Sequence, residues 1–321
     1  MNYKRIAKAL LRMLYKFNRQ LYRIFFVTPV LAYKKRHCAA INDFKMYKTF
    51  SYEPQGFYPA ILKQGKQTTD KIYKRIVRFD SKLIPTVNGF EQEYWPVTIV
   101  QYGLLNYNFY LTYNEEKYKE IIKNVCDWLV DNISDNGIWE HHITYHSTVV
   151  NEDLLPPYAS AMVQGEAISL LVRGYRLFGN QKYLASAACA LAPFSVESKN
   201  GGVLAHFYGM PFYEEYPTET PSLVLNGFLF SLFGLYDFSK TNHAKASYAN
   251  KLFEAGSKTL IKVLPLYDGG FCSRYDLSYI TCAPNNNNKN PFYHAIHVNQ
   301  LIAINSILNS KVIEYYINEW R

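Results

Sequence analysis

Tyrosine and glutamate side chains gather in the loops that precede apolar segments of the sequence. The densest group is Glu214-Glu215-Tyr216, and Tyr275 and Tyr293 follow later in the chain. Carboxylates can act as general bases, phenol hydroxyls can donate protons, and aromatic faces pack against sugar rings. Adjacent side chains point in different directions, so we expect only one of the two glutamates to reach a shared site. These residue types favour a carbohydrate site.

Histidines form two further groups. His294 and His297 could bind a carboxylate or be hydrogen-bonded in the core, while His141, His142 and His146 have a spacing that matches no metal motif. The second group therefore fits polar lining better than a metal site. The sequence contains no zinc signature, dinucleotide fingerprint or P-loop, so we predict neither a metal nor a cofactor.

Four segments open with Gln or Asn and continue as apolar helical patterns, at intervals of 63, 62 and 73 residues, starting at Gln101, Gln164, Asn226 and Asn299. Each is followed by a polar break and an amphipathic segment, which predicts a buried first helix and an outer second helix. Stacked helix pairs bury a shared core and curve, so the predicted fold is mainly α, an α/α-barrel (toroid), open or closed. Close helix packing is expected at small residues inside the first helices, namely Gly103, Gly165 and Gly227.

The loops that enter the first helices of a toroid lie at one end of it. All four loops carry tyrosine and span residues 93–96, 156–160, 213–217 and 291–294. We therefore expect them to meet on one rim, where the free N–H groups of helix N-termini favour an anionic ligand.

Two regions precede the helical repeats. Residues 41–93 include an alternating stretch from Ile72 to Phe79, which predicts a small β-hairpin region. Residues 1–40 are predicted to be a basic amphipathic arm, because residues 1–36 contain ten Lys or Arg and no acidic residue. The α/α-barrel catalytic domain is predicted for residues 94–321.

The net charge of +9 belongs to this arm. The rest of the chain carries 25 Lys or Arg against 26 Asp or Glu, and a nearly neutral body argues against nucleic-acid binding. Residues 4–25 fit either a helix lying on an anionic membrane surface or a helix packed on the body, and they are too charged to span a bilayer. The five cysteines are scattered, as free thiols in a reducing compartment would be, so we expect a cytoplasmic protein, with peripheral attachment to the inner face of the membrane as the alternative.

Several strings resemble the C-terminal region of the glucuronyl C5-epimerases of heparin and heparan sulfate synthesis. They are WPVTIVQYGLLNY (95–107), YASAMVQGEAISLLVRGY (158–175), YEEYPTETPSLVLNGF (213–228), LPLYDGG (264–270), RYDLSY (274–279) and YHAIHVNQL (293–301). The resemblance covers most of residues 44–321. It implies an α/α-barrel, an acidic polysaccharide substrate, inversion of D-glucuronate to L-iduronate at C5 within the polymer, and a homodimer.

The resemblance also implies roles for individual residues. The family's catalytic Glu and Tyr of the EEYP string, Tyr of YDL and Tyr of YH correspond to Glu215, Tyr216, Tyr275 and Tyr293. The resemblance adds Tyr102 and Tyr47 as site residues, and the sequence itself adds Arg274, His294 and Tyr158 as expected substrate-binding residues.

This sequence departs from the family in two respects. An Arg that follows the YDL string is Ser278 here, so Arg274 would have to replace it in holding a substrate carboxylate. Animal members also carry a β-sandwich domain before the helical region, and we expect none here because the preceding residues are too few.

Three other functions remain open at this level. A polysaccharide lyase would form the same C5 carbanion and then expel the C4 oxygen. A glycoside hydrolase needs two separated carboxylates, for which Glu215 with Glu166 or Asp276 could serve. A non-catalytic polysaccharide-binding protein would bind without exchange at C5.

Overall fold

The computed structural model describes residues 46–60, 77–88, 92–147, 150–270, 272–282 and 288–321. The chain divides into two units, Met1–Lys45 and Met46–Arg321. The predicted arm falls in the first unit and lies outside the described residues, as does the start of the alternating stretch at Ile72.

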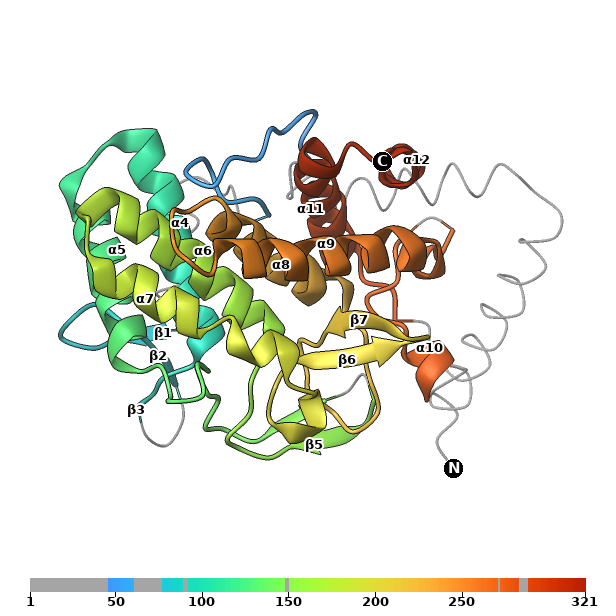
Figure 1. Cartoon of the computed structure of the whole chain (residues 1–321), viewed down its shortest axis with the longest axis horizontal. Helices are drawn as coiled ribbons and strands as arrows, with labels where there is room; N and C mark the ends of the chain where they lie inside the picture. The colour runs from blue at the N-terminus through green and yellow to red at the C-terminus, as the bar shows by residue number, and fades with distance from the viewer. Residues whose placement is uncertain (1–45, 61–76, 89–91, 148–149, 271, 283–287) are drawn as a thin grey trace, which may run out of the picture. The chain divides into compact units, whose positions relative to one another are not determined.

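The second unit is mainly helical, and its described residues contain the predicted helix pairs (Figure 1). The pairs are α4 (Pro96–Tyr113) with α5 (Glu116–Asp131), α6 (Ala161–Phe178) with α7 (Gln181–Cys189), α8 (Leu225–Ser239) with α9 (Ala246–Val263), and α11 (Pro291–Leu308) with α12 (Lys311–Trp320). A single helical turn, α10 (Ser278–Thr281), lies between α9 and α11.

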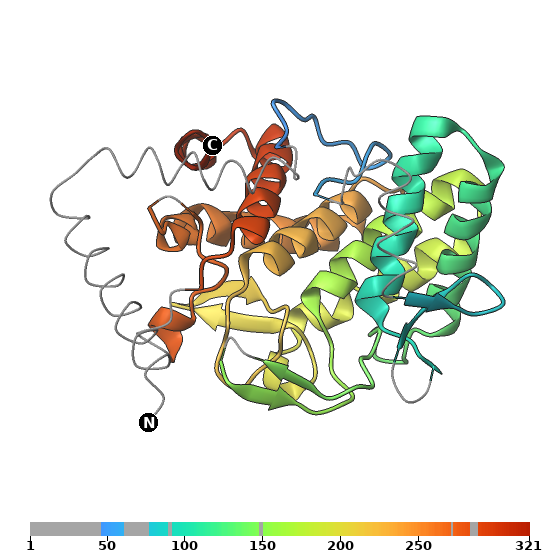
Figure 2. The same cartoon turned by 180° about the vertical axis from the view of Figure 1, so that it is seen from behind.

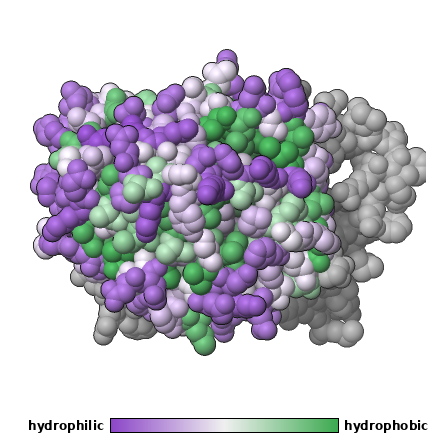
Figure 3. Space-filling model, in the orientation of Figure 1, coloured by the Kyte–Doolittle hydropathy of each residue, from purple (hydrophilic) through white to green (hydrophobic). Residues whose placement is uncertain are grey.

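The burial pattern of the pairs agrees with the predicted inner and outer helices. Every residue of α6 from Ala161 to Gly174 is buried, whereas α5 buries one face only. Hydrophilic residues predominate along the edge of the molecule where the α4–α5 pair lies (Figure 3). The inner helices pack on one another in the order α4, α6, α8 and α11. Closure of this row into a toroid stays a prediction.

The predicted small residues lie at close approaches. A Cβ on Gly103 would run into Leu170 of α6, and one on Gly165 would run into the backbone of α8 at Phe230. Gly227 differs, because a Cβ there would lie 2.5 Å from Oε2 of Glu215. The first two glycines therefore admit neighbouring helices, and the third admits a functional side chain.

Helix α11 begins earlier than its sequence pattern predicts. The side chain of Asn290 accepts a hydrogen bond from the Phe292 N–H at 2.9 Å, and Pro291 occupies the first helical position, where its missing N–H costs nothing. Tyr293 and His294 therefore lie in the first turn of α11 and not in the preceding loop.

Short strands precede the first helices of three of the pairs. The predicted β region is an antiparallel sheet of β1 (Val77–Phe79), β2 (Pro85–Asn88) and β3 (Gln92–Glu93). Two hairpins inside the helical region were not expected, β4 (Tyr145–Ser147) with β5 (Glu152–Leu154) and β6 (Leu204–Phe207) with β7 (Met210–Tyr213). Both hairpins lie along the same edge of the unit, next to the ends where α6 and α8 begin (Figure 2).

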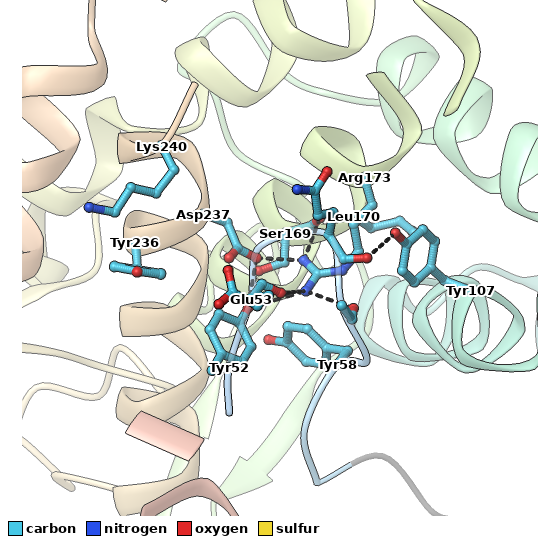
Figure 4. Close-up of polar contacts among 12 residues, drawn as sticks. Tyr52, Glu53, Tyr58, Tyr107, Ser169, Leu170, Arg173, Tyr236, Asp237 and Lys240 are labelled. Carbon is cyan, nitrogen blue, oxygen red and sulfur yellow. Dashed lines mark hydrogen bonds and ion pairs between the residues drawn. The ribbon is translucent and has the colours of Figure 1, made fainter. Parts of the chain in front are cut away.

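A buried ion pair joins α6 to α8 (Figure 4). Arg173 Nη1 donates to Asp237 Oδ2 at 2.5 Å, and both side chains are fully buried. Asp237 also accepts from the Tyr52 hydroxyl at 2.8 Å, while the guanidinium lies over the rings of Tyr58 and Tyr107. This cluster fixes residues 46–60 against the helices.

Among the residues that the structure describes, no helix combines the length and the apolar character needed to cross a bilayer. Four of the five cysteines are described, and all four are free. Cys126 is buried, and Cys189 is exposed at the end of α7.

Replacement of Asp237 by Asn should lower the free energy of unfolding by about 3–5 kcal/mol, because it leaves the Arg173 guanidinium buried without a counter-charge. Urea unfolding followed by circular dichroism measures this change. The control is Glu314→Gln, which removes an exposed ion pair with Lys311 and should leave the free energy of unfolding nearly unchanged. Equal losses in the two variants would contradict the role assigned to the buried pair.

Candidate active site

Aromatic contacts connect the entrances of the inner helices, as the sequence predicts. Tyr145 of β4 stacks on Tyr216 with ring centroids 5.0 Å apart and an interplanar angle of 8°, and Trp95 before α4 approaches Tyr145 edge-on at 6.4 Å. The ring centroids of Tyr275 and Tyr293 lie 4.4 Å apart, and both side chains pack with Tyr216 around Val224. Residues far apart in the sequence therefore meet where α4, α8 and α11 begin.

The second entrance joins this group through His141. His141 stacks on Tyr158 with centroids 4.8 Å apart and an interplanar angle of 3°, and Trp95 meets the histidine ring edge-on at 5.7 Å. Burial lowers the pKa of His141 to about 4 and raises that of Tyr158 to about 12, so both rings are neutral at pH 7.

Glu215 lies at the N-terminus of α8. Val224, the residue before this helix, provides no side-chain cap, and the Glu215 carboxylate accepts hydrogen bonds from the Gly227 backbone N–H and from the side chains of Tyr216 and Asn226. Burial raises the pKa of Glu215 to about 7, and these three donors limit the rise because they stabilise the ionised form.

A chain of hydrogen bonds runs from Glu215 through Tyr216 and Tyr275 to Tyr293. An ionised carboxylate only accepts, so Tyr216 must donate to Glu215, and a hydroxyl has a single proton. Tyr275 therefore donates to Tyr216, and Tyr293 donates to Tyr275. Burial raises the pKa of all three phenols, and the Glu215 charge adds to the rise, so they stay protonated at neutral pH.

Glu214 points away from this chain. Its carboxylate accepts from the Ser222 hydroxyl at 2.9 Å and from the Leu223 backbone N–H at 3.0 Å, which holds the loop before α8. Burial raises its pKa to about 8. The two adjacent glutamates have different partners, as expected, and Glu215 is the one that contacts the tyrosines.

The structure brings together Glu215, Tyr216, Tyr275, Tyr293 and Tyr158 among the residues proposed from the sequence. The four other proposed residues have partners elsewhere. Tyr102 packs on Phe79 of β1 with centroids 5.2 Å apart. Tyr47 stacks on Phe50, and its hydroxyl accepts from the Ala60 N–H.

Arg274 and His294 are also engaged within the fold. The Arg274 guanidinium lies 4.4 Å from the centre of the Tyr279 ring. His294 is buried, with Nδ1 bonded to Ser273 at 2.9 Å and Nε2 to the Trp320 carbonyl at 2.9 Å, so both ring nitrogens are occupied by the protein. Ser278, at the position of the family's Arg, donates its hydroxyl to Asp276.

Two residues at this site were not proposed for it. Tyr145 stacks on Tyr216, which donates to Glu215, but the segment around Tyr145 has no sequence pattern that pointed to this role. Glu166 of α6 is fully buried, accepts from Gln101 of α4 at 3.2 Å and lies within electrostatic reach of Glu215. The sequence offered Glu166 only as a partner of Glu215 in a hydrolase.

No group of three or more His, Cys, Asp or Glu side chains suited to a metal ion occurs within the described part of the chain. The second histidine group is dispersed, since His141 stacks on Tyr158 while His146 pairs with Asp153 at 2.7 Å on the exposed hairpin. The chemistry that the described side chains offer is proton transfer between one carboxylate and a chain of phenols.

Comparisons with known proteins identify the family of the chain. The family model described as D-glucuronyl C5-epimerase C-terminus matches residues 132–321. The chain is 39% identical over 221 residues to D-glucuronyl C5-epimerase of Caenorhabditis elegans, which covers 65% of this chain and 36% of that protein. It is 30% identical over 172 residues to an uncharacterized protein of Methanocaldococcus jannaschii, which covers 51% of this chain and 52% of that protein.

The chain thus spans about half or less of the length of these relatives. The family match itself extends over more than half of this chain and includes Glu215, Tyr216, Tyr275 and Tyr293. The chain belongs to the D-glucuronyl C5-epimerase C-terminus family.

Proposed function

We propose that this protein is a polysaccharide uronate C5-epimerase that converts D-glucuronate to L-iduronate within a heparosan-like polymer. The observation that supports it most is the hydrogen-bonded chain from Glu215 through Tyr216 to Tyr275. Inversion at C5 needs a base on one face of the sugar and an acid on the other, and this chain joins one of each.

Glu215 suits the base. A general base works best when its pKa lies near the working pH, and burial brings Glu215 to about 7. An exposed glutamate with an ordinary pKa of about 4 would be a far weaker base towards a C–H bond. Glu215 removes the C5 proton, and the electron pair of the broken C–H bond is delocalised into the adjacent carboxylate.

Tyr275 suits the acid. Its raised pKa keeps the hydroxyl protonated at neutral pH, so it can deliver a proton to C5 on the opposite face. After that step Tyr275 is a phenolate and Glu215 is protonated. Tyr216 lies between them, so it can pass its own proton to Tyr275 while it receives one from Glu215, which restores the starting state without a cofactor.

Several further properties of the protein stay predictions. Substrate binding by Tyr102 and Tyr47 stays an expectation from the family resemblance, and substrate binding by Arg274 and His294 stays an expectation from the sequence. The same holds for the homodimer, for membrane contact through residues 4–25 and for a cytoplasmic location.

The first test is proton NMR of the purified protein incubated with heparosan in heavy water. We expect deuterium at C5, new iduronate signals and an intact chain. Glu215→Gln and Tyr275→Phe should each slow exchange at C5 by roughly 10²–10⁴-fold, because each removes one of the two proton-transfer groups.

The matched control is Glu214→Gln, which alters a buried glutamate next to Glu215 that contacts Ser222 and Leu223 instead of the tyrosines. It should keep exchange within roughly tenfold of the unmodified protein. Near-normal exchange in both test variants would refute the assignment. Exchange accompanied by unsaturated chain ends would identify a lyase, and binding without exchange would identify a binding protein.

The rate should also depend on pH through Glu215. Only the ionised carboxylate can accept the C5 proton, so kcat/KM for exchange should rise with pH and level off above the Glu215 pKa of about 7. The free energy of unfolding should change with pH in the opposite direction to the rate, because folding raises the pKa of Glu215. The contribution of Glu215 to that free energy is complete below about pH 4.5 and is lost as pH rises through about 7. A rate profile measured from about pH 5 to 9 that is flat, or that rises near 4.5, would contradict Glu215 as the base.

A further inference from the structure

Glu166 is a second buried carboxyl that the reaction just described does not use. It lies in α6, next to the glycine at which α6 and α8 touch. Its side chain is fully buried, and Oε1 accepts from Gln101 Nε2 at 3.2 Å. Oε2 is also buried and has no hydrogen-bond partner among the described residues.

Glu215 has a matching unsatisfied atom. Its Oε2 is buried and likewise finds no hydrogen-bond donor in the described part of the chain. The two carboxyls are close enough to interact electrostatically. Two like charges buried within reach of each other are too costly to coexist, so such a pair retains a proton.

The hydrogen-bond donors around each carboxyl decide which one keeps the proton. Glu215 receives donors from Tyr216, Asn226 and the Gly227 N–H, and it lies at the positive end of α8. Glu166 receives a single neutral amide, from Gln101. The negative charge is therefore better supported on Glu215, and the proton belongs on Glu166.

The other groups that face Glu166 do not reverse this balance. Tyr58, from residues 46–60, interacts with Glu166 electrostatically and is a neutral phenol whose hydroxyl has no described partner. The nearest buried cation on α6 is Arg173, and its charge is matched by Asp237 at 2.5 Å. No described cation is thus placed to hold Glu166 ionised.

We propose that Glu166 and Glu215 form a buried carboxyl pair that shares one proton, held by Glu166, and one negative charge, held by Glu215. Glu166 is then a positioning residue, because it acts through Glu215 and not on the sugar. While Glu166 is neutral, Glu215 can ionise near neutral pH. A charge on Glu166 would raise the pKa of Glu215 and leave less of that carboxylate ionised at neutral pH. The part of the proposal that concerns catalysis rests on the proposed function.

The first experiment counts protons and needs no substrate. The full chain is unfolded thermally near pH 7 in two buffers of different ionisation enthalpy, and calorimetry gives the number of protons released. An unfolded glutamate is ionised at this pH, so Glu166 should release about one proton on unfolding. Glu166→Gln should release about one proton fewer, and the exposed control Glu314→Gln should match the unmodified protein. Equal release by Glu166→Gln and the unmodified protein would overturn the proposal.

A second measurement covers the case in which Glu166→Gln does not fold. Carbon NMR of protein labelled at the glutamate side-chain carboxyls follows each carboxyl directly, with Glu214→Gln used to assign the signal of Glu214. The proposal requires one remaining buried glutamate that stays protonated while Glu215 titrates. If Glu215 is the last of the remaining glutamates to ionise, the proposal is wrong.

The pH profile of C5 exchange tests the link to catalysis. Replacing a neutral Glu166 by neutral Gln should move the acid limb of the profile by less than about half a pKa unit. A fall of the acid limb by more than about one unit would mean that Glu166 carried a charge, which contradicts the proposal. If heparosan shows no exchange at all, the proposed function fails, while proton release still decides whether the pair exists.

Discussion

The free N–H groups at the start of α6 and α8 are the constraint on which the site depends. Neither helix has a capping side chain of its own, because Ser160 and Val224 make no side-chain cap. The dipeptide Glu214-Glu215 supplies what is missing, since the Glu214 carbonyl accepts from the Ala161 N–H at 2.9 Å and the Glu215 carboxylate accepts from Gly227. Helix ends must find partners when they are buried, so the two glutamates are fixed by the same need that stabilises the helices.

The same end of α8 also fixes Tyr275. Its backbone carbonyl accepts from the Leu225 N–H at 3.0 Å, so the proposed acid and the proposed base are both tied to the first turn of one helix. The β6–β7 hairpin brings the glutamates to this place through a two-residue turn in which Tyr208 and Gly209 both have positive φ, at 49° and 76°. Leu223 holds a further positive φ of 56°, and Glu214 accepts from its N–H, so the carboxylate of one glutamate steadies the backbone that positions the other.

These arrangements explain what the sequence could and could not predict. Apolar periodicity identified the helix pairs, and the glycines at α4 and α6 marked close packing as expected. The hairpins were missed because strands of three or four residues leave too little alternation, and their register depends on turns such as Tyr208-Gly209. Family resemblance identified Glu215 and the three tyrosines, but Tyr145 and Glu166 acquire their partners only through tertiary packing, which no local pattern records.

The protein buries two pairs of ionisable side chains, one of opposite charge and one of like groups. At Arg173 and Asp237 opposite charges meet, with Tyr52 and ring faces completing the shell, so burial holds the helices together. At Glu166 and Glu215 like groups meet, each with a buried oxygen that lacks a described partner, so burial works against the ionised state. Such an arrangement costs stability, and what it yields is a carboxylate whose affinity for a proton matches neutral pH. Glu166 lies in α6 and the Glu215 carboxylate accepts from the first turn of α8, so the ion pair of Arg173 and Asp237 joins the two helices that hold the two carboxyls.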